Sequence, residues 1–321
     1  SDVEREKRLL VGTLSPTYET PRRRVERTVR ELLYPRHAYR FAIEGTAESV
    51  AGLGRRQLQE IHRTQLQPSQ MVLAVVGDVD PDRVIRKVRA LFEVDPPARL
   101  RAKATLRPPP VTALAPAAGG APHRRQLEIE RQLTWVGVGA LGVSISDPDR
   151  AALELLVAIL GGQGGRLFVE LRDRAALGYD VNAQSIEGLD RGYVYLSVAT
   201  SVDRAAEAET RLLAEIDKLR LEPPTATELQ RARRWLQGEL AARLERRTAL
   251  ASSLAYYEAA GVGWDAHDLP RRSASTSPAS GSAVPASSLT ALATPTPATS
   301  GAPRFSIASA ARRLTLSMRQ L

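Results

Sequence analysis

The sequence predicts an α+β fold, in which helices cover one face of a β-sheet. Apolar residues recur at three- and four-residue steps over residues 25–33, which is typical of an amphipathic helix. Apolar residues alternate with polar ones over residues 126–130, and residues 193–199 have the apolar and aromatic composition of a strand. Strands and helices then follow one another in turn, and this order favours a sheet with helices on one face.

The length and composition leave room for about two domains with real hydrophobic cores. The chain has 321 residues, of which 43% are hydrophobic and 5% aromatic. It has no apolar run of about 18 residues, so we expect no membrane span. It has no cysteine, which excludes disulfides, thiolate catalysis and thiolate zinc sites and leaves the compartment open between bacterial cytoplasm and periplasm.

The net charge of +9 raises the question of a nucleic-acid partner. The arginines are scattered among acidic residues on the predicted helices, and no aromatic residues are interleaved with them. We interpret the charge as belonging to solvated helix faces, and we expect no nucleic-acid partner.

Residues 1–34 are predicted to be helical, with breaks at Pro16 and Pro21. A loop is expected at residues 34–40, because a proline disfavours helical conformation in the residue before it. His37 lies in this loop, and we interpret it as a packing residue rather than a metal ligand.

Two helices and a buried strand are predicted between residues 55 and 92. Residues 55–64 form the first helix, on which His62 is expected to be a partly buried structural residue. Residues 71–79 are an almost continuous apolar run that contains a Gly-Asp pair, which is typical of a buried strand. A helix then begins at Pro81, and its apolar stripe is expected to be buried.

The composition changes abruptly at residues 96–125, where prolines, alanines and glycines replace the apolar periodicity. Such a segment cannot build a packed core, so we predict a linker there. A second domain is predicted over residues 126–270, beginning with strands at 126–130 and 133–141. Its further elements are a helix after Asp149, strands at 179–183 and 193–199, and helices at 205–219 and from Thr225, where Thr225 and Glu228 form a capping box.

Residues 271–321 are predicted to be a disordered low-complexity tail. From Ser273 onward Ser, Ala, Thr and Pro dominate, and the segment contains no acidic residue. Such a composition buries too little apolar surface to offset the entropy of ordering. A frameshift and a genuine extension both explain a tail of this kind.

A glycine-rich stretch at residues 161–165 precedes a short amphipathic helix that Gly178 ends. Arg172 and Tyr179 bracket the end of this helix. A glycine-rich turn before a helix can hold a phosphate, but this one lacks the Lys-Ser/Thr of a P-loop and the acidic residue of a dinucleotide site. A tight turn with a surface arginine and a half-buried tyrosine is the other interpretation that the residues alone allow.

The string GGQGGRLFVELRDRAALGY, residues 161–179, resembles the C-terminal domain of the pitrilysin/insulinase family of zinc metallopeptidases, which includes the mitochondrial processing peptidases. His-Ala-Tyr at residues 37–39 is similar to the HPY of that family, and VVGDV at residues 75–79 to the end of one of its domains. The resemblance implies two α/β-roll domains of the pitrilysin/processing-peptidase type, with antiparallel or mixed sheets covered by helices. Residues 1–95 are then the C-terminal part of a first, catalytic-type domain that is incomplete, and residues 126–270 a second, substrate-binding domain of the inactive type.

The resemblance also implies roles for three residues. Arg172 and Tyr179 match an arginine and a tyrosine that, in the family, reach the active site of the preceding domain, bind the substrate backbone and stabilise the tetrahedral intermediate. Glu4, in the string Glu-Arg-Glu-Lys, matches the third zinc ligand, although a solvated charge is an equally good interpretation of it.

The motif that would complete a zinc site is absent from the sequence. The family binds zinc through the two histidines of H-x-x-E-H, whose glutamate activates water. The four histidines of this chain are not paired at that spacing; they are His37, His62, His123 and His267. We therefore expect Zn²⁺ to bind only if another segment or a companion peptidase chain supplies the two histidines.

These observations predict a portion of a zinc metalloendopeptidase that binds unfolded or extended peptides and is inactive alone. The alternative is a non-catalytic, substrate-binding or structural partner subunit of an active family member. A damaged gene fragment without activity is a third possibility. The sequence begins in mid-pattern and without methionine, so an upstream segment is expected.

Overall fold

The computed structural model describes residues 2–14, 20–66, 68, 71–92, 123–128, 133–268 and 304–309. The chain divides into two compact units. Unit 1 comprises residues 1–18, 43–107 and 239–269, and unit 2 comprises residues 19–42, 108–238 and 270–321. Each unit therefore combines segments that lie far apart in the sequence.

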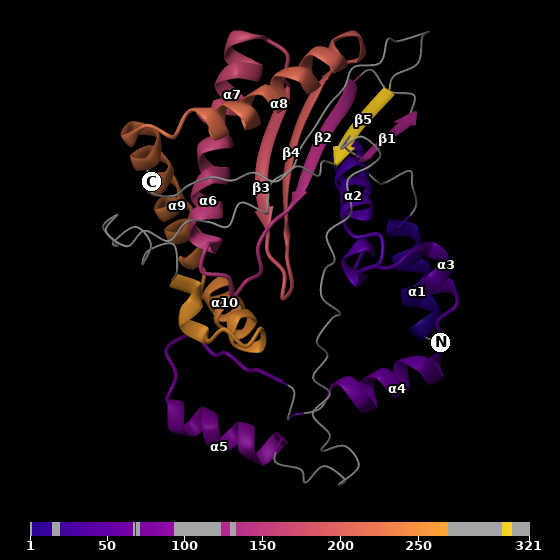
Figure 1. Cartoon of the computed structure of the whole chain (residues 1–321). Helices are drawn as coiled ribbons and strands as arrows, with labels where there is room; N and C mark the ends of the chain where they lie inside the picture. Colours follow the sequence, from indigo (N-terminus) through magenta and orange to yellow (C-terminus); the bar gives the residue numbers. More distant parts are fainter. Residues whose placement is uncertain are drawn as a thin grey trace. The chain divides into compact units, whose positions relative to one another are not determined.

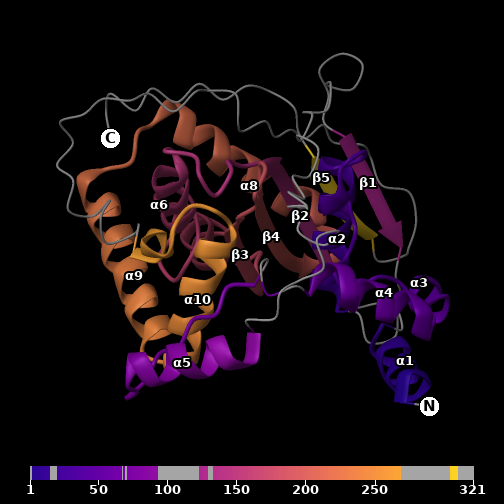
Figure 2. The ribbon, with the colours of Figure 1, turned by 90° about the horizontal axis from the view of Figure 1, so that it is seen from below.

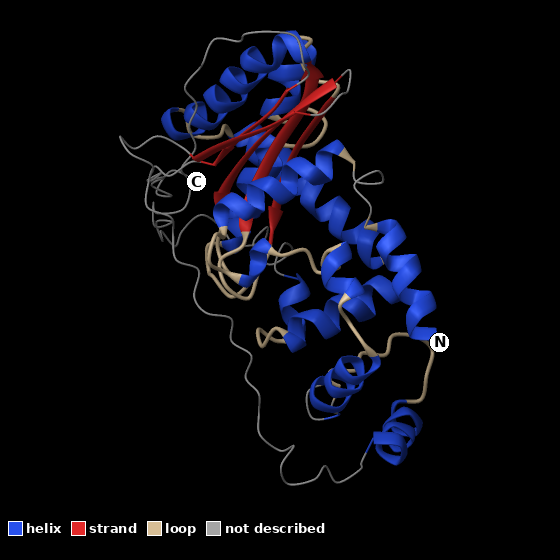
Figure 3. Cartoon of the chain, turned by 90° about the vertical axis from the view of Figure 1, so that its right-hand side faces the viewer, coloured by secondary structure: helices blue, strands red, loops and turns tan. Residues whose placement is uncertain are grey.

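Unit 2 is built on a five-stranded sheet with the strand order β1-β5-β2-β4-β3 (Figure 1). The strands are β1 (His123–Glu128), β2 (Leu133–Leu141), β3 (Asp180–Ile186), β4 (Tyr193–Ser201) and β5 (Arg304–Ser309). The pair β2 and β5 is parallel, and the other neighbouring pairs are antiparallel. Figure 3 shows these strands together as one sheet among helices, which confirms the predicted α+β class.

One face of this sheet carries the main hydrophobic core. Successive residues of a strand point to opposite faces, and Val136 and Val138 on β2 are buried on the same face as Val198 on β4. Buried residues of α6 (Arg150–Leu160), α7 (Arg166–Phe168), the following π-helix (Val169–Arg174) and α8 (Ala205–Leu221), including Leu171 and Leu212, complete the core. The helices of unit 2 are α2 (Pro21–Leu33), η1 (Ala38–Arg40), α6 (Arg150–Leu160), α7 (Arg166–Phe168), η5 (Val169–Arg174), η6 (Val202–Arg204), α8 (Ala205–Leu221) and the first part of α9 (Ala226–Leu244).

Helix α2 covers the opposite face of the sheet, and Figure 2 shows it on a different side of the strands from α6. A Cβ atom added to Gly137 would lie 2.4 Å from Val25, and one added to Gly139 would lie 2.1 Å from Val29. The helix therefore rests directly on the backbone of β2. Although α2 precedes the predicted linker, it packs on the sheet that follows it; the predicted domain boundary at residue 95 stays a prediction.

The described residues of unit 1 form helices joined by irregular segments. The helices are α1 (Asp2–Thr13), α3 (Ala47–Ala51), α4 (Arg55–Gln65), α5 (Pro81–Phe92), α10 (Arg247–Ala259) and η7 (Trp264–Asp268), together with the end of α9. The Lys7 ammonium of α1 donates a hydrogen bond to the Leu53 carbonyl oxygen at 2.8 Å, next to α3. The helices predicted before and after the two N-terminal prolines, over residues 55–64, and from Pro81 are confirmed. None of the helices in the described part of the chain is long and apolar enough to cross a membrane.

The buried strand predicted at residues 71–79 is wrong. Residues 71–76 are irregular, without strand pairing in the described part of the chain, and Leu73 is 62% exposed. A strand is buried only where neighbouring strands accept and donate its backbone hydrogen bonds, and the described residues of unit 1 offer helices instead. The apolar stripe of α5, which was predicted to be buried, is exposed as well, and Leu91 is 63% exposed. His62 on α4 is exposed rather than partly buried.

Strand β5 lies within the segment predicted to be disordered. Residues 304–309 pair with β1 on one side and β2 on the other. The disorder prediction is wrong for these six residues, because Arg-Phe-Ser-Ile-Ala-Ser alternates as a strand does and the composition of the whole tail concealed this short pattern. Residues 269–303 and 310–321 lie outside the described residues, as does most of the predicted linker.

Candidate functional site

The glycine-rich stretch forms the turn between α6 and α7. Gly162 and Gly164 have φ angles of 72° and 85°, which glycine adopts without a steric penalty. A Cβ atom on Gly165 would lie 1.9 Å from the carbonyl oxygen of Gly161. The backbone of the turn therefore requires these glycines independently of any ligand.

Arg166 anchors this turn to the start of α9. Its Nε and Nη2 atoms donate to the two carboxylate oxygens of Glu228 at 2.7 and 3.0 Å. Glu228 also accepts from the backbone N–H of Thr225 at 2.8 Å, and its own N–H donates to the Thr225 hydroxyl oxygen at 3.2 Å, which confirms the predicted capping box. The bonds from Arg166, followed by those from Thr225, lower the pKa of Glu228 to about 2.

Helix α7 continues as the π-helix η5 instead of the α-helix that the sequence pattern predicts. The Ala175 N–H donates to the Glu170 carbonyl oxygen at 3.1 Å, five residues earlier. The Leu171 carbonyl oxygen accepts from the Leu177 N–H at 2.7 Å and from the Gly178 N–H at 3.0 Å. Single π-helical turns of this kind are frequent at functional sites.

The turn that follows η5 contains an unusual backbone conformation. Ala176 has a φ angle of 49°, in the left-handed region that side chains with a Cβ atom rarely adopt. A Cβ atom on Gly178 would lie 2.6 Å from Val181, so only glycine fits there. The Tyr179 N–H then donates to the Ala199 carbonyl oxygen of β4 at 2.9 Å, and β3 begins.

Arg172 and Tyr179 both project into solvent from this segment. Tyr179 is 66% exposed, and Arg172 is exposed with its guanidinium carbon 5.0 Å from the centre of the Phe168 ring. Within the described residues, neither the Arg172 guanidinium nor the Tyr179 hydroxyl has a hydrogen-bond partner. The turn therefore presents a cation and a phenol to solvent, and the exposure of Tyr179 disfavours its interpretation as a half-buried core residue.

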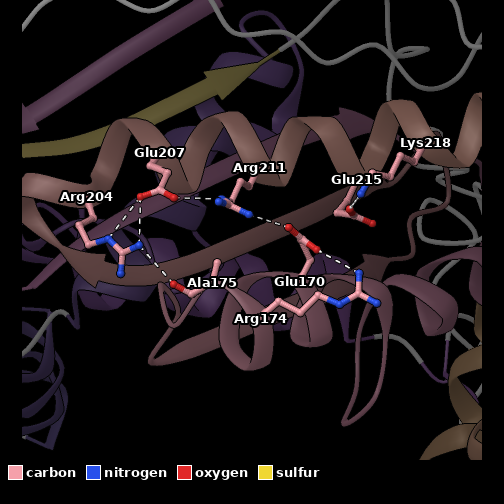
Figure 4. Close-up of polar contacts among 8 residues, drawn as sticks. All are labelled: Glu170, Arg174, Ala175, Arg204, Glu207, Arg211, Glu215 and Lys218. Carbon is pink, nitrogen blue, oxygen red and sulfur yellow. Dashed lines mark hydrogen bonds and ion pairs between the residues drawn. The ribbon is translucent and has the colours of Figure 1, made fainter.

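A row of charged side chains connects the turn to α8 (Figure 4). Arg204, at the start of α8, donates to the carbonyl oxygen of Ala175 at 3.2 Å and to that of Ala176 at 3.1 Å. It also pairs with Glu207 at 3.0 Å. Glu207 pairs in turn with Arg211 at 3.0 Å, so the row continues along the helix.

Arg211 carries the row back to η5. It donates to one carboxylate oxygen of Glu170 at 2.7 Å, and Arg174 donates to the other at 3.4 Å. Burial alone would raise the pKa of Glu170, but the hydrogen bonds from the two arginines outweigh burial and lower it. This network was not predicted from the sequence. The three- and four-residue spacing of Arg204, Glu207 and Arg211 was a local signal for their pairing, but nothing local joins them to η5.

A cavity of about 420 Å³ opens beside η5 and the glycine turn. Its charged lining residues are Arg166, Arg174, Lys218, Arg231, Glu170, Glu215, Glu222 and Glu228. Several of these charges neutralise each other, as in the pairs of Arg166 with Glu228 and of Lys218 with Glu215. Such a balanced lining does not favour a phosphate, in agreement with the missing P-loop residues.

Glu4 lies on α1 in unit 1, whereas Arg172 and Tyr179 lie in unit 2. Its carboxylate is exposed and accepts a hydrogen bond from Lys7 at 3.3 Å. Among the described residues, no group of three or more His, Asp or Glu side chains is assembled to hold a metal ion. Since a zinc site needs at least three protein ligands, the residues present in these segments do not fit zinc by themselves.

His37 packs in its loop as predicted. It is buried, its Nδ1 atom accepts from the Tyr39 N–H at 3.1 Å, and its ring lies against the Tyr34 and Tyr39 rings. This arrangement supports the loop that links α2 to unit 1 and leaves His37 a structural residue.

Comparisons with known proteins support the resemblance to the zinc metallopeptidases. An uncharacterized zinc protease of Streptomyces coelicolor is 26% identical over 284 residues, which are 86% of this chain and 60% of that protein. The probable β subunit of the mitochondrial-processing peptidase of Arabidopsis thaliana is 26% identical over 207 residues, 62% of this chain and 38% of that protein. The chain thus spans about 60% or less of the length of these relatives.

Solved structures share the fold. A protease from Helicobacter pylori superimposes with a TM-score of 0.71 at 19% identity, covering 86% of this chain and 66% of that one. A peptidase M16 inactive domain from Pseudomonas fluorescens has a TM-score of 0.65 at 18% identity, covering 98% of this chain and 72% of that one. The family described as peptidase M16 inactive domain matches residues 52–236, more than half of the chain. This match confirms the resemblance to the pitrilysin-type zinc peptidases, and the chain belongs to the peptidase M16 inactive-domain family.

Proposed function

We propose that the chain is a portion of a pitrilysin-type zinc metalloendopeptidase in which Arg172 and Tyr179 act on a bound, extended peptide. The observation that carries this proposal is the pair itself. Two polar groups capable of hydrogen bonding are exposed and have no hydrogen-bond partner in the described part of the chain; Arg172 lies in the π-helix, and Tyr179 follows the left-handed turn.

The chemistry of the two groups suits peptide hydrolysis. A guanidinium donates to the carbonyl oxygens of an extended backbone and so orients the peptide. A phenol donates one hydrogen bond, and a donor aimed at the oxygen that becomes negative is stronger in the transition state than in the ground state. Arg172 would therefore serve binding and charge stabilisation, and Tyr179 mainly the second.

The zinc ion belongs to the proposal only through its other ligands. Glu4 offers one exposed carboxylate, and a single carboxylate does not hold the ion. We infer that the two histidines come from a segment or companion chain with H-x-x-E-H. The chain alone, with zinc added, should then leave an unstructured fluorogenic peptide intact, and chelator-sensitive turnover by the chain alone would contradict this.

The central test replaces Tyr179 in an enzyme reconstituted with a segment that carries H-x-x-E-H. Tyr179→Phe should lower kcat by roughly tenfold to a thousandfold with a smaller change in KM, because the lost donor acts in the transition state. Arg172→Ala should lower kcat and also raise KM. The matched control is Tyr256→Phe, an exposed tyrosine of unit 1. An unchanged kcat in Tyr179→Phe would refute the proposed role.

The alternative is a non-catalytic, substrate-binding or structural partner subunit of an active peptidase. Like the first proposal, it is consistent with the absence of a metal-binding group among the described residues. In that case the chain binds a labelled unfolded peptide and raises the activity of its companion, whereas Tyr179→Phe changes KM but not kcat.

A further inference from the structure

The side chain of Arg204 bonds the turn between Arg172 and Tyr179 from a distant part of the sequence. The end of η5 leaves carbonyl oxygens without helical partners, and Arg204 donates to two of them, those of Ala175 and Ala176. Ala176 is the residue in the left-handed conformation. The guanidinium of Arg204 thus bonds the carbonyl oxygens of the two peptide groups on either side of the Ala176 Cα atom.

We propose that Arg204 is a positioning residue, which fixes the Ala175–Ala176 turn so that Arg172 and Tyr179 face a bound peptide together. This inference rests on the proposed function. No hydrogen bond or ion pair in the described part of the chain joins Arg204 to Arg172 or Tyr179, and it acts through the backbone between them. The planar fork of a guanidinium can donate to two carbonyl oxygens at once, which an ammonium on a flexible stem does poorly.

Neighbouring charges hold Arg204 in this orientation. Its Nε and Nη2 atoms donate to Glu207 at 3.3 and 3.0 Å, which leaves Nη1 and the second bond of Nη2 directed at the turn. The hydrogen bond from Arg204, with that from Arg211, lowers the pKa of Glu207, so Glu207 is ionised at neutral pH. At neutral pH, Glu207 therefore holds the Arg204 guanidinium in the orientation that bonds the turn.

Hydrogen exchange of the full chain tests the contact without any activity. Arg204→Gln should speed the exchange of the Leu177 and Gly178 amides, which bond the Leu171 carbonyl oxygen, by about tenfold. Ala176→Gly in the Arg204→Gln background should recover about fivefold, since glycine adopts the left-handed conformation freely. Arg174→Gln is the matched control, because Arg174 pairs with Glu170 but does not touch the turn. Equal exchange in Arg204→Gln and the unchanged chain overturns the proposal.

A double-mutant cycle in the reconstituted enzyme tests the positioning itself. Arg204→Gln should lower kcat roughly tenfold when Tyr179 is present and much less in the Tyr179→Phe variant. Once the Tyr179 hydroxyl is removed, a displacement of the turn no longer weakens a hydrogen bond in the transition state. Ala176→Gly should partly restore kcat in the first case, and Arg204→Lys should be intermediate. If Tyr179→Phe lowers kcat but Arg204→Gln is additive with it, the positioning role is wrong and the proposed function stands. If Tyr179→Phe has no effect, both fail.

Discussion

At the scale of single residues, two carboxylates of unit 2 have pKa values shifted in opposite directions. The hydrogen bonds from Arg166 lower the pKa of Glu228 to about 2. Burial raises the pKa of Glu154 to about 7, against the attraction of Arg150, and the neighbouring Glu187 carboxylate raises it further. For Glu228 the hydrogen bonds from Arg166 and Thr225 outweigh burial, whereas for Glu154 burial and the neighbouring Glu187 outweigh the attraction of Arg150.

Glu228 should make the fold sensitive to acid. A lowered pKa stabilises the folded state above the ordinary value of 4.5, and this contribution is lost as the pH falls towards 2. Glu228→Gln should therefore lower the free energy of unfolding by about 2–3 kcal/mol at pH 7 and by much less at pH 2.5. Urea unfolding at both pH values measures this, with the exposed Asp173→Asn as control. The same loss at both pH values would contradict the ion-pair explanation.

Glu154 should act in the opposite sense. A raised pKa means that the neutral carboxyl favours the folded state; its contribution is complete below about pH 4.5 and is lost as the pH rises through about 7. Glu154→Gln keeps the side chain neutral, so it should be more stable than the unchanged chain at pH 8.5, by on the order of 2 kcal/mol, and similar to it at pH 4.5. Thermal unfolding at the two pH values gives the comparison. A stability difference between Glu154→Gln and the unchanged chain that does not depend on pH would show that Glu154 ionises normally.

At the scale of elements, the contact between α2 and β2 depends on two glycines. Gly137 and Gly139 leave room for the side chains of Val25 and Val29, which are fully buried. This packing brings the helix closer to the strand than side chains on both surfaces would allow. The contact should therefore be more sensitive to added methyl groups than to the loss of methyl groups.

Gly137→Ala should lower the free energy of unfolding by about 1–3 kcal/mol, because the new methyl group overlaps Val25. The helical Gly238 has nothing near its missing Cβ atom, so Gly238→Ala should instead raise stability by about 0.5–1 kcal/mol. Denaturant unfolding of the two variants measures both. Similar effects in the two would show that backbone entropy, rather than packing, governs Gly137.

Local patterns predicted most helices, because their signals lie within a few residues. The capping box of Thr225 and Glu228 is one such signal, and it holds in the structure. The π-helix and the left-handed Ala176 were not predictable, because the contacts around them are tertiary. The carbonyl oxygens of Ala175 and Ala176 accept hydrogen bonds from Arg204, which lies nearly thirty residues away in the sequence. The strand expected at residues 71–79 failed because an apolar run specifies burial only when partner strands exist.

The candidate site was predictable in part. Arg172 and Tyr179 came from a string of residues that resembles a known family, and their exposure is consistent with that assignment. Glu4 stays a prediction, because its surroundings show only Lys7. The Glu170–Arg211 contact could not be found from the sequence, since charges on helix faces pair in many alternative ways.

At the scale of the whole molecule, the two compact units do not follow chain order. Helix α2 lies before residue 93 and belongs to unit 2, whereas residues 239–269 lie between β4 and β5 in the sequence and belong to unit 1. The chain therefore passes between the units several times. Such interleaving should make the two halves of the chain depend on each other for stability.

A protease site placed between residues 93 and 122 of the full chain tests this dependence. After cleavage of the folded protein, the two pieces should elute together on size exclusion, since α2 of the first piece remains packed on β2 of the second. Gly139→Val, which fills the space of Val29, should let the pieces separate. Gly238→Ala is the control. Separation of the unchanged pieces under native conditions would argue against a stable α2 contact.

The packing of α2 on β2 also has a consequence for the nascent chain during synthesis. Val29 is synthesised well before its partner Gly139, with roughly a hundred residues between them. At about 5–20 residues per second, the ribosome takes on the order of ten seconds to supply the strand. During that interval the apolar stripe of the helix is uncovered, so the nascent polypeptide carries a binding surface for chaperones that disappears once the strand arrives.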